Sequence, residues 1–205
     1  MKTKLKLFLK ENGRYALASF LIPLLILTLV YLSIGIYPGS DRSILASDAF
    51  SQFSNFHASF RNMLLGKQSI FYTWNASLGL NYLSLISYYL GGIFTPLVVL
   101  FPNQMMPDAL YFLTILKVGC AGLSFWFLAR TYKIPRWGHV ALSVSYASIS
   151  FITAHSEIIM WLDAFIYLPL IILGIHRVMD LKKPIVLFVS YLLLFLSSFY
   201  MGFMI

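Results

Sequence analysis

Residues 82–101 read YLSLISYYLGGIFTPLVVLF. The stretch is long enough to cross about 30 Å of hydrocarbon as a helix, which takes roughly 20 apolar residues. The pair Gly91–Gly92 and Pro96 interrupt it, however, as in segments that re-enter the membrane or lie on its surface. Whether this stretch crosses the membrane decides the side on which every later loop lies.

Basic residues in the later loops discriminate between the two arrangements. If residues 82–101 cross, six bases face the outside and Glu157 faces the cytoplasm; if they do not, the bases are cytoplasmic and Glu157 is outside. The six are Arg130, Lys133, Arg136, Arg177, Lys182 and Lys183. Because cytoplasmic loops of membrane proteins carry an excess of Lys and Arg, the second arrangement is favoured. We therefore expect an outer region of juxtamembrane or re-entrant helices over residues 38–107.

The composition is that of a membrane protein. Hydrophobic residues make up 60% of the chain and charged residues 11%, which is too apolar for an ordinary soluble domain. The net charge is +8, but the bases are scattered at the ends of apolar runs and form no patch, so they indicate topology and not nucleic-acid binding. The single cysteine, Cys120, lies in an apolar run and excludes both an intramolecular disulfide and a cysteine-based metal site.

Apolar runs predict the membrane spans. We expect an all-α, polytopic protein of the cell membrane, with a cytoplasmic N-terminus marked by the bases between Lys2 and Arg14. The expected spans cover about residues 15–37, 108–131, 137–154, 160–179 and 184–205. The last run reaches the end of the chain, so we expect residues 1–205 to be the N-terminal part of a longer multi-spanning protein.

A second stretch, ASDAFSQF at residues 46–53, opens the polar part of the outer region. Helical spacing places five polar residues on one stripe, and Ser47 and Gly66 are residue types expected at the start and end of such a helix. The stripe consists of Asp48, Gln52, Asn55, Ser59 and Asn62. We expect a helix that lies on the membrane surface and turns this stripe towards a cavity.

Acids near the outer membrane surface are candidates for function. A carboxylate close to hydrocarbon is costly unless it faces a cavity or a partner. For Asp41 and Asp108 we favour the role of solvated residues at helix ends, whereas the polar stripe favours a functional role for Asp48. Glu157 and Asp163 fit either a functional role or the capping of the fourth span.

Three cationic or titratable residues could accompany these acids. Lys117 lies in the middle of the second span and needs an anion there, either an acid, a backbone carbonyl or a lipid phosphate; a structural ion pair is the favoured interpretation. Arg61 could meet a lipid phosphate or anchor the chain at the headgroups. His155 either assists in a site or forms an ordinary hydrogen bond at the interface.

Five strings, taken together and in order, resemble the bacterial YfhO family of membrane proteins over nearly the whole chain. They are SDAFSQF, FYTWNASLGLN, SYYLGGIFTPLVVLFP, LKVGCAGLSFWFLAR and MWLDAFIYLPLIILGI. This family is similar to the GT-C glycosyltransferases, which take a sugar from a polyprenyl-phosphate carrier on the outer face of the membrane. The resemblance implies a GT-C-like transmembrane bundle and the glycosylation of a cell-surface polymer such as teichoic or lipoteichoic acid.

The resemblance also implies roles for individual residues. Asp48 matches by position the catalytic acid in the first outer loop of GT-C enzymes, and Glu157 or Asp163 matches the second acid. Asp48 would act as general base, and cations would stabilise the leaving phosphate. The expected substrate-binding residues are Glu157, Asp163, Gln52, Arg61, Lys117 and His155.

The resemblance also implies binding partners, and the sequence leaves alternative functions open. The expected partners are a polyprenyl-phosphate-linked sugar, which is a substrate, a polymer acceptor and the lipid bilayer, with no nucleic acid. Many GT-C enzymes pair two acids in the first loop, whereas this chain has Asp48 and the more distant Asp41, so a divalent metal remains open. The alternatives are a lipid or polysaccharide transporter or flippase, in which Lys117 and the outer acids form a path, and a non-catalytic cell-envelope subunit.

Overall fold

The computed structural model describes residues 2–76 and 78–205, and nearly all regular structure in these residues is helical. The only strands among them are β1 (Tyr72–Thr73) and β2 (Leu80–Asn81), which pair antiparallel as a small hairpin. The all-α class expected from the sequence is confirmed.

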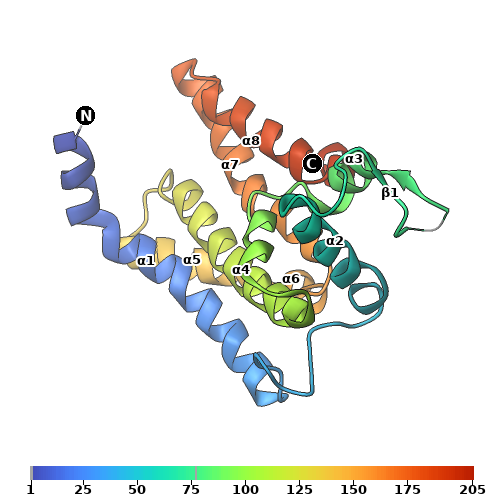
Figure 1. Ribbon diagram of the computed structural model, residues 1–205. Helices are drawn as coiled ribbons and strands as arrows, with labels where there is room; N and C mark the ends of the chain where they lie inside the picture. Colours follow the sequence, from blue (N-terminus) through green and yellow to red (C-terminus); the bar gives the residue numbers. More distant parts are fainter. Residues whose placement is uncertain (1, 77) are drawn as a thin grey trace.

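Among the described residues, three helices are long and apolar enough to cross a membrane: α1 (Lys2–Ser33), α4 (Met106–Ala129) and α7 (Ile159–Leu181). Helix α4 lies between the other two and packs against both (Figure 1). Gly122 allows α1 and α4 to approach closely, because a Cβ at this position would collide with the carbonyl oxygen of Ser19. Small residues at such crossings are typical of helices that pack within membranes.

Contacts at the helix ends establish which ends lie together. The backbone N–H of Gly39, after α1, donates to Oδ1 of Asp108 at the start of α4 (3.1 Å), and the Tyr31 hydroxyl donates to Ser156 just before α7 (2.8 Å). At the opposite end, Arg136 donates to the carbonyl of Glu11 (3.3 Å). Figure 1 accordingly shows the N-terminus and the α7–α8 turn away from α2, α3 and β1.

Two of the expected spans are divided. Residues 137–154 form α5 (Arg136–Ala147) and α6 (Ser150–Ala154), and residues 184–205 form α8 (Ile185–Ser197) and α9 (Phe199–Met204). The breaks occur where Ile149 and Ser198 are extended, and the Ser198 side chain accepts a hydrogen bond from the N–H of Met201. Apolar composition does not predict these breaks, because a single serine that caps a new helix leaves the surrounding run hydrophobic.

The stretch 82–101 forms several short helices and no single long one. In order they are α3 (Tyr82–Leu85), the π-helix η2 (Ile86–Leu90) and the 3₁₀-helix η3 (Thr95–Leu100), followed by a further 3₁₀ turn, η4 (Asn103–Met105), before α4. The turn at Gly91 and Gly92 is tightly enclosed. A Cβ at Gly91 would collide with the carbonyl of Leu196, and one at Gly92 would lie 2.6 Å from Oδ2 of Asp163.

The polar stretch begins with a π-helical turn, η1 (Ala49–Phe53), and continues as α2 (Ser54–Leu64). The expectation that Ser47 caps this helix is wrong. Ser47 has a left-handed backbone (φ 48°), so it lies outside the helix, and Asp48 occupies the cap position without a cap hydrogen bond. Gly66, with φ 71°, follows the end of α2, where its N–H bonds to the carbonyl of Met63.

Candidate functional site

Asp48 and Glu157 line the same pocket, of about 50 Å³, although they are far apart in the sequence. Asp48 precedes η1 and is exposed, whereas Glu157 is half-buried in the loop before α7. Ser47, Ala49, Phe53 and Ile158 complete the wall. Two acidic residues from different parts of the chain therefore line one pocket, near the start of α7; we call this the Asp48–Glu157 pocket.

Gln52 connects Asp48 to a tyrosine. The Gln52 amide nitrogen donates to Oδ1 of Asp48 (3.4 Å), and the Tyr89 hydroxyl donates to Oε1 of Gln52 (3.5 Å). Burial raises the pKa of the Tyr89 hydroxyl, with smaller contributions from Tyr88 and the Asp48 carboxylate, so Tyr89 stays protonated as a donor. Sequence analysis missed Tyr89, because nothing in the aromatic run 82–101 separates it from residues of the apolar core.

Asp163 and Lys117 form an ion pair away from this pocket. The Lys117 ammonium lies 2.8 Å from Oδ2 of Asp163 and also donates to the carbonyl of Ile159 (3.0 Å). Helix α7 begins at Ile159, so Asp163 lies within its second turn. Neither side chain lines the Asp48–Glu157 pocket.

Arg61 and His155 also lie outside the Asp48–Glu157 pocket. Arg61 is half-buried on the last turns of α2. The His155 ring packs beside Phe151 and Trp161, with ring centroids 4.6 Å and 6.1 Å apart. Of the expected site residues, the structure thus brings Asp48, Gln52 and Glu157 together at the Asp48–Glu157 pocket and pairs Lys117 with Asp163 elsewhere.

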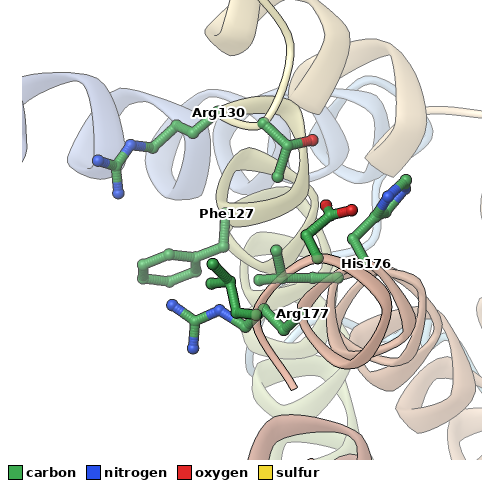
Figure 2. Close-up of a pocket in the computed structure, with 8 residues that line it drawn as sticks. Phe127, Arg130, His176 and Arg177 are labelled. Atoms are coloured by element: carbon green, nitrogen blue, oxygen red, sulfur yellow. The ribbon is translucent and has the colours of Figure 1, made fainter. Parts of the chain in front are cut away.

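Larger cavities lie elsewhere among the described residues, and two of them bear on the function. A groove of about 590 Å³ runs between α2 and the β1–β2 hairpin, and Asn55, Ser59 and Asn62 of the predicted polar stripe line it. A cavity of about 270 Å³ lies between the last turns of α4 and α7 (Figure 2). Its lining includes Arg130 and Arg177, so this end of the helices is basic, in contrast to the Asp48–Glu157 pocket.

The described residues contain no group of three or more His, Cys, Asp or Glu side chains placed to hold a metal ion. The Asp48–Glu157 pocket offers two carboxylates.

Comparison with models of known families identifies the family of this chain. A profile described as "Bacterial membrane protein YfhO" matches residues 19–205, which include both carboxylates of the pocket, all of α4 and α7, and α1 from residue 19 onwards. The chain belongs to the YfhO family. No curated protein and no solved structure matches it significantly. This YfhO protein is thus a bacterial membrane protein associated with the cell envelope, and its long apolar helices contact the lipid bilayer.

Proposed function

We propose that this YfhO protein is a glycosyltransferase that moves a sugar from a polyprenyl-phosphate carrier to a cell-surface polymer, such as teichoic or lipoteichoic acid, on the outer face of the membrane. The observation that carries the proposal is the pocket shared by Asp48 and Glu157. Paired carboxylates are the usual means of activating a hydroxyl and positioning a sugar for glycosyl transfer.

The distribution of charge supports an outward-facing pocket. Arg130, Arg177 and the bases around the α7–α8 turn lie at the end of the bundle opposite to Asp48 and Glu157. By the positive-inside rule, the basic end and the N-terminus face the cytoplasm and the two acids face outward. The three long apolar helices then make the protein multi-pass. This orientation requires a donor that is already on the outer leaflet, which a lipid-linked sugar provides.

In the proposed reaction, Asp48 accepts the proton of the acceptor hydroxyl while the hydroxyl oxygen attacks the anomeric carbon of the donor. The bond from that carbon to the carrier phosphate oxygen breaks, and the phosphate leaves with the bonding electron pair. A single displacement of this kind inverts the anomeric configuration. The hydrogen bonds from Tyr89 to Gln52 and from Gln52 to Asp48 orient the base.

The size of the pocket limits what enters it. A volume of about 50 Å³ admits a group the size of a hydroxyl or a water molecule and excludes a whole sugar ring. The reacting hydroxyl therefore enters beside Asp48 and Glu157, and the bodies of both substrates lie outside. Glu157 then positions the hydroxyl against the base.

The leaving phosphate needs a cationic partner. We retain Arg61 and His155 as candidates, because Arg61 lies on α2 and His155 lies in the loop that carries Glu157. The Lys117 ammonium is enclosed with Asp163, so we assign it a structural role. The Lys117–Asp163 ion pair is also the feature that would favour a transporter, since charges within the membrane often mark substrate paths.

Transfer of a labelled sugar by the purified protein tests the proposal and separates it from that alternative. With a radiolabelled polyprenyl-phosphate sugar and the polymer as acceptor, a glycosyltransferase releases polyprenyl phosphate and labels the polymer. A flippase in liposomes would instead move the lipid-linked sugar between leaflets and leave it intact. Flipping without transfer would refute the proposed function.

A further inference from the structure

The groove between α2 and the β1–β2 hairpin is the largest of the cavities described above, and every side chain that lines it is uncharged. One wall is the face of α2 that carries Asn55, Ser59 and Asn62. The other wall is the hairpin, and Leu85 of α3 closes the groove between them. The lining residues are Ser51, Asn55, Phe56, Ala58, Ser59, Asn62, Thr73, Asn75, Ala76, Leu80 and Leu85.

The chemistry of this lining selects a neutral polyhydroxylated ligand. Serine and threonine hydroxyls and asparagine amides both donate and accept hydrogen bonds, as do the hydroxyls of a sugar. Phe56, Leu80 and Leu85 supply apolar surface for the C–H face of a sugar ring. A phosphate or carboxylate would find no cationic partner among these residues, so its desolvation would be uncompensated. The volume of about 590 Å³ falls in the usual range for small-molecule sites.

Hydrogen bonds hold the α2 wall of the groove in place, and close packing holds the hairpin wall. Ser59 donates to the side-chain carbonyl of Gln68 (2.9 Å), and the Asn62 side-chain oxygen accepts from Asn103 (3.1 Å). In the hairpin, Gly79 has φ 95° and lies against the Tyr72 ring, where a Cβ would collide with the Tyr72 hydroxyl. Polar groups fixed in this way lose little freedom when they bind a ligand.

The groove also begins close to the proposed base. Asn55 follows Gln52, the partner of Asp48, by about one helical turn, and lies about 10 Å from Asp48 along the chain of η1 and α2. A saccharide in the groove would therefore extend from the vicinity of the Asp48–Glu157 pocket, which is itself too small to hold a sugar.

We infer that this groove binds an uncharged saccharide unit of one of the two substrates. The inference rests on the proposed function for its role in the reaction, but binding itself does not require transfer to occur. Two sources share this chemistry: the sugar of the lipid-linked donor and a sugar carried by the polymer acceptor.

Saturation-transfer NMR on the purified protein tests this inference with two neutral probes, maltotriose and chitotriose. We expect at least one of them to bind, and the double variant Asn62→Ala/Asn75→Ala, which removes one amide from each wall, to bind it about 10-fold more weakly. Gln104→Ala, which removes an exposed amide outside the groove, is the matched control and keeps full binding. Because no lining residue is charged, raising the salt from about 0.05 M to 0.5 M changes the affinity by less than about twofold.

Competition with the lipid-linked donor identifies the source of the sugar. Displacement of the bound trisaccharide assigns the groove to the donor sugar, and its retention assigns the groove to the acceptor; both agree with a saccharide site. The inference is overturned if neither trisaccharide binds, or if the double variant binds as tightly as the wild type. Asp48→Asn separates this outcome from the fate of the proposed function, because it abolishes transfer and leaves trisaccharide binding unchanged.

Discussion

The Lys117 ammonium lies 2.8 Å from Oδ2 of Asp163, and each side chain is only 2% exposed. This pair joins α4 to α7 at the point where the Gly91–Gly92 turn packs against α7, since a Cβ on Gly92 would lie 2.6 Å from the same oxygen. One buried contact therefore fixes two membrane helices and the folded stretch 82–101 relative to each other. Glu157 of the Asp48–Glu157 pocket directly precedes α7, so one side of the pocket is attached to a helix that this contact holds in place.

Breaking the ion pair on one side is expected to be worse than removing it altogether. Lys117→Met leaves the Asp163 carboxylate buried without a counter-charge and should lower the free energy of unfolding by about 3–5 kcal/mol. The double variant Lys117→Met/Asp163→Leu removes both charges and should recover most of this loss. Thermal unfolding in detergent measures both variants; a double variant as unstable as the single one would contradict the structural role.

The close packing at Gly91 and Gly92 predicts that added methyl groups are not tolerated. Gly91→Ala forces the turn away from the carbonyl of Leu196, and Gly92→Ala pushes against a carboxylate that the ion pair holds in place. Each substitution should destabilise the protein by about 1–3 kcal/mol. Gly13→Ala in α1, where nothing lies within 4 Å of the added Cβ, is the control and should be neutral or slightly stabilising. Equal stability of all three variants would show that the turn is loosely packed.

His57 makes stability dependent on pH. It is 2% exposed, its Nδ1–H donates to the carbonyl of Phe53 (2.7 Å), and burial lowers its pKa from 6.5 to about 4, with the Phe53 bond opposing this shift and the charge of Lys117 adding to it. The unfolded chain thus binds a proton below about pH 6.5, whereas the folded protein does so only below about pH 4, so stability is lost as the pH falls through this window.

Between pH 7 and pH 5 this effect amounts to about 2 kcal/mol, or a fall in Tm of roughly 4–8 °C. His57→Asn keeps a donor for Phe53 but cannot titrate, so its Tm should change less over the same range. His176→Asn, at an exposed histidine of α7, serves as the control and should follow the wild type. If His57→Asn and the wild type lose the same Tm on acidification, another group is responsible.

The orientation of Asp48 by Gln52 and Tyr89 predicts a graded effect on transfer. Gln52→Ala removes the side chain bonded to Asp48 and should lower kcat about 10-fold with little change in KM. Tyr89→Phe removes only the outer hydrogen bond and should have a smaller effect of a few-fold. Tyr88→Phe, at a neighbouring ring packed on Phe199, is the control. A change in KM with kcat unaltered would point to a binding role for Gln52 instead.

Sequence patterns could predict the features that depend on composition and on local spacing. Apolar runs gave the all-α membrane class, and the helical spacing of Asn55, Ser59 and Asn62 placed them on one face, which lines the groove. The same patterns could not find the pairing of Lys117 with Asp163, because it depends on where α7 begins and on the contact between two distant helices. Tyr89 was missed for a related reason, since its role comes from a single hydrogen bond made through tertiary packing.

Rates of sugar transfer by Asp48→Asn provide the most direct test of the proposed glycosyltransferase. Asparagine keeps the shape of the side chain but cannot accept the hydroxyl proton, so transfer from the polyprenyl-phosphate donor should fall by about 100-fold or more. Asp41→Asn removes an exposed acid of the same loop that does not line the Asp48–Glu157 pocket, and should transfer at the wild-type rate. Wild-type transfer by folded Asp48→Asn would contradict the assignment of Asp48 as the general base.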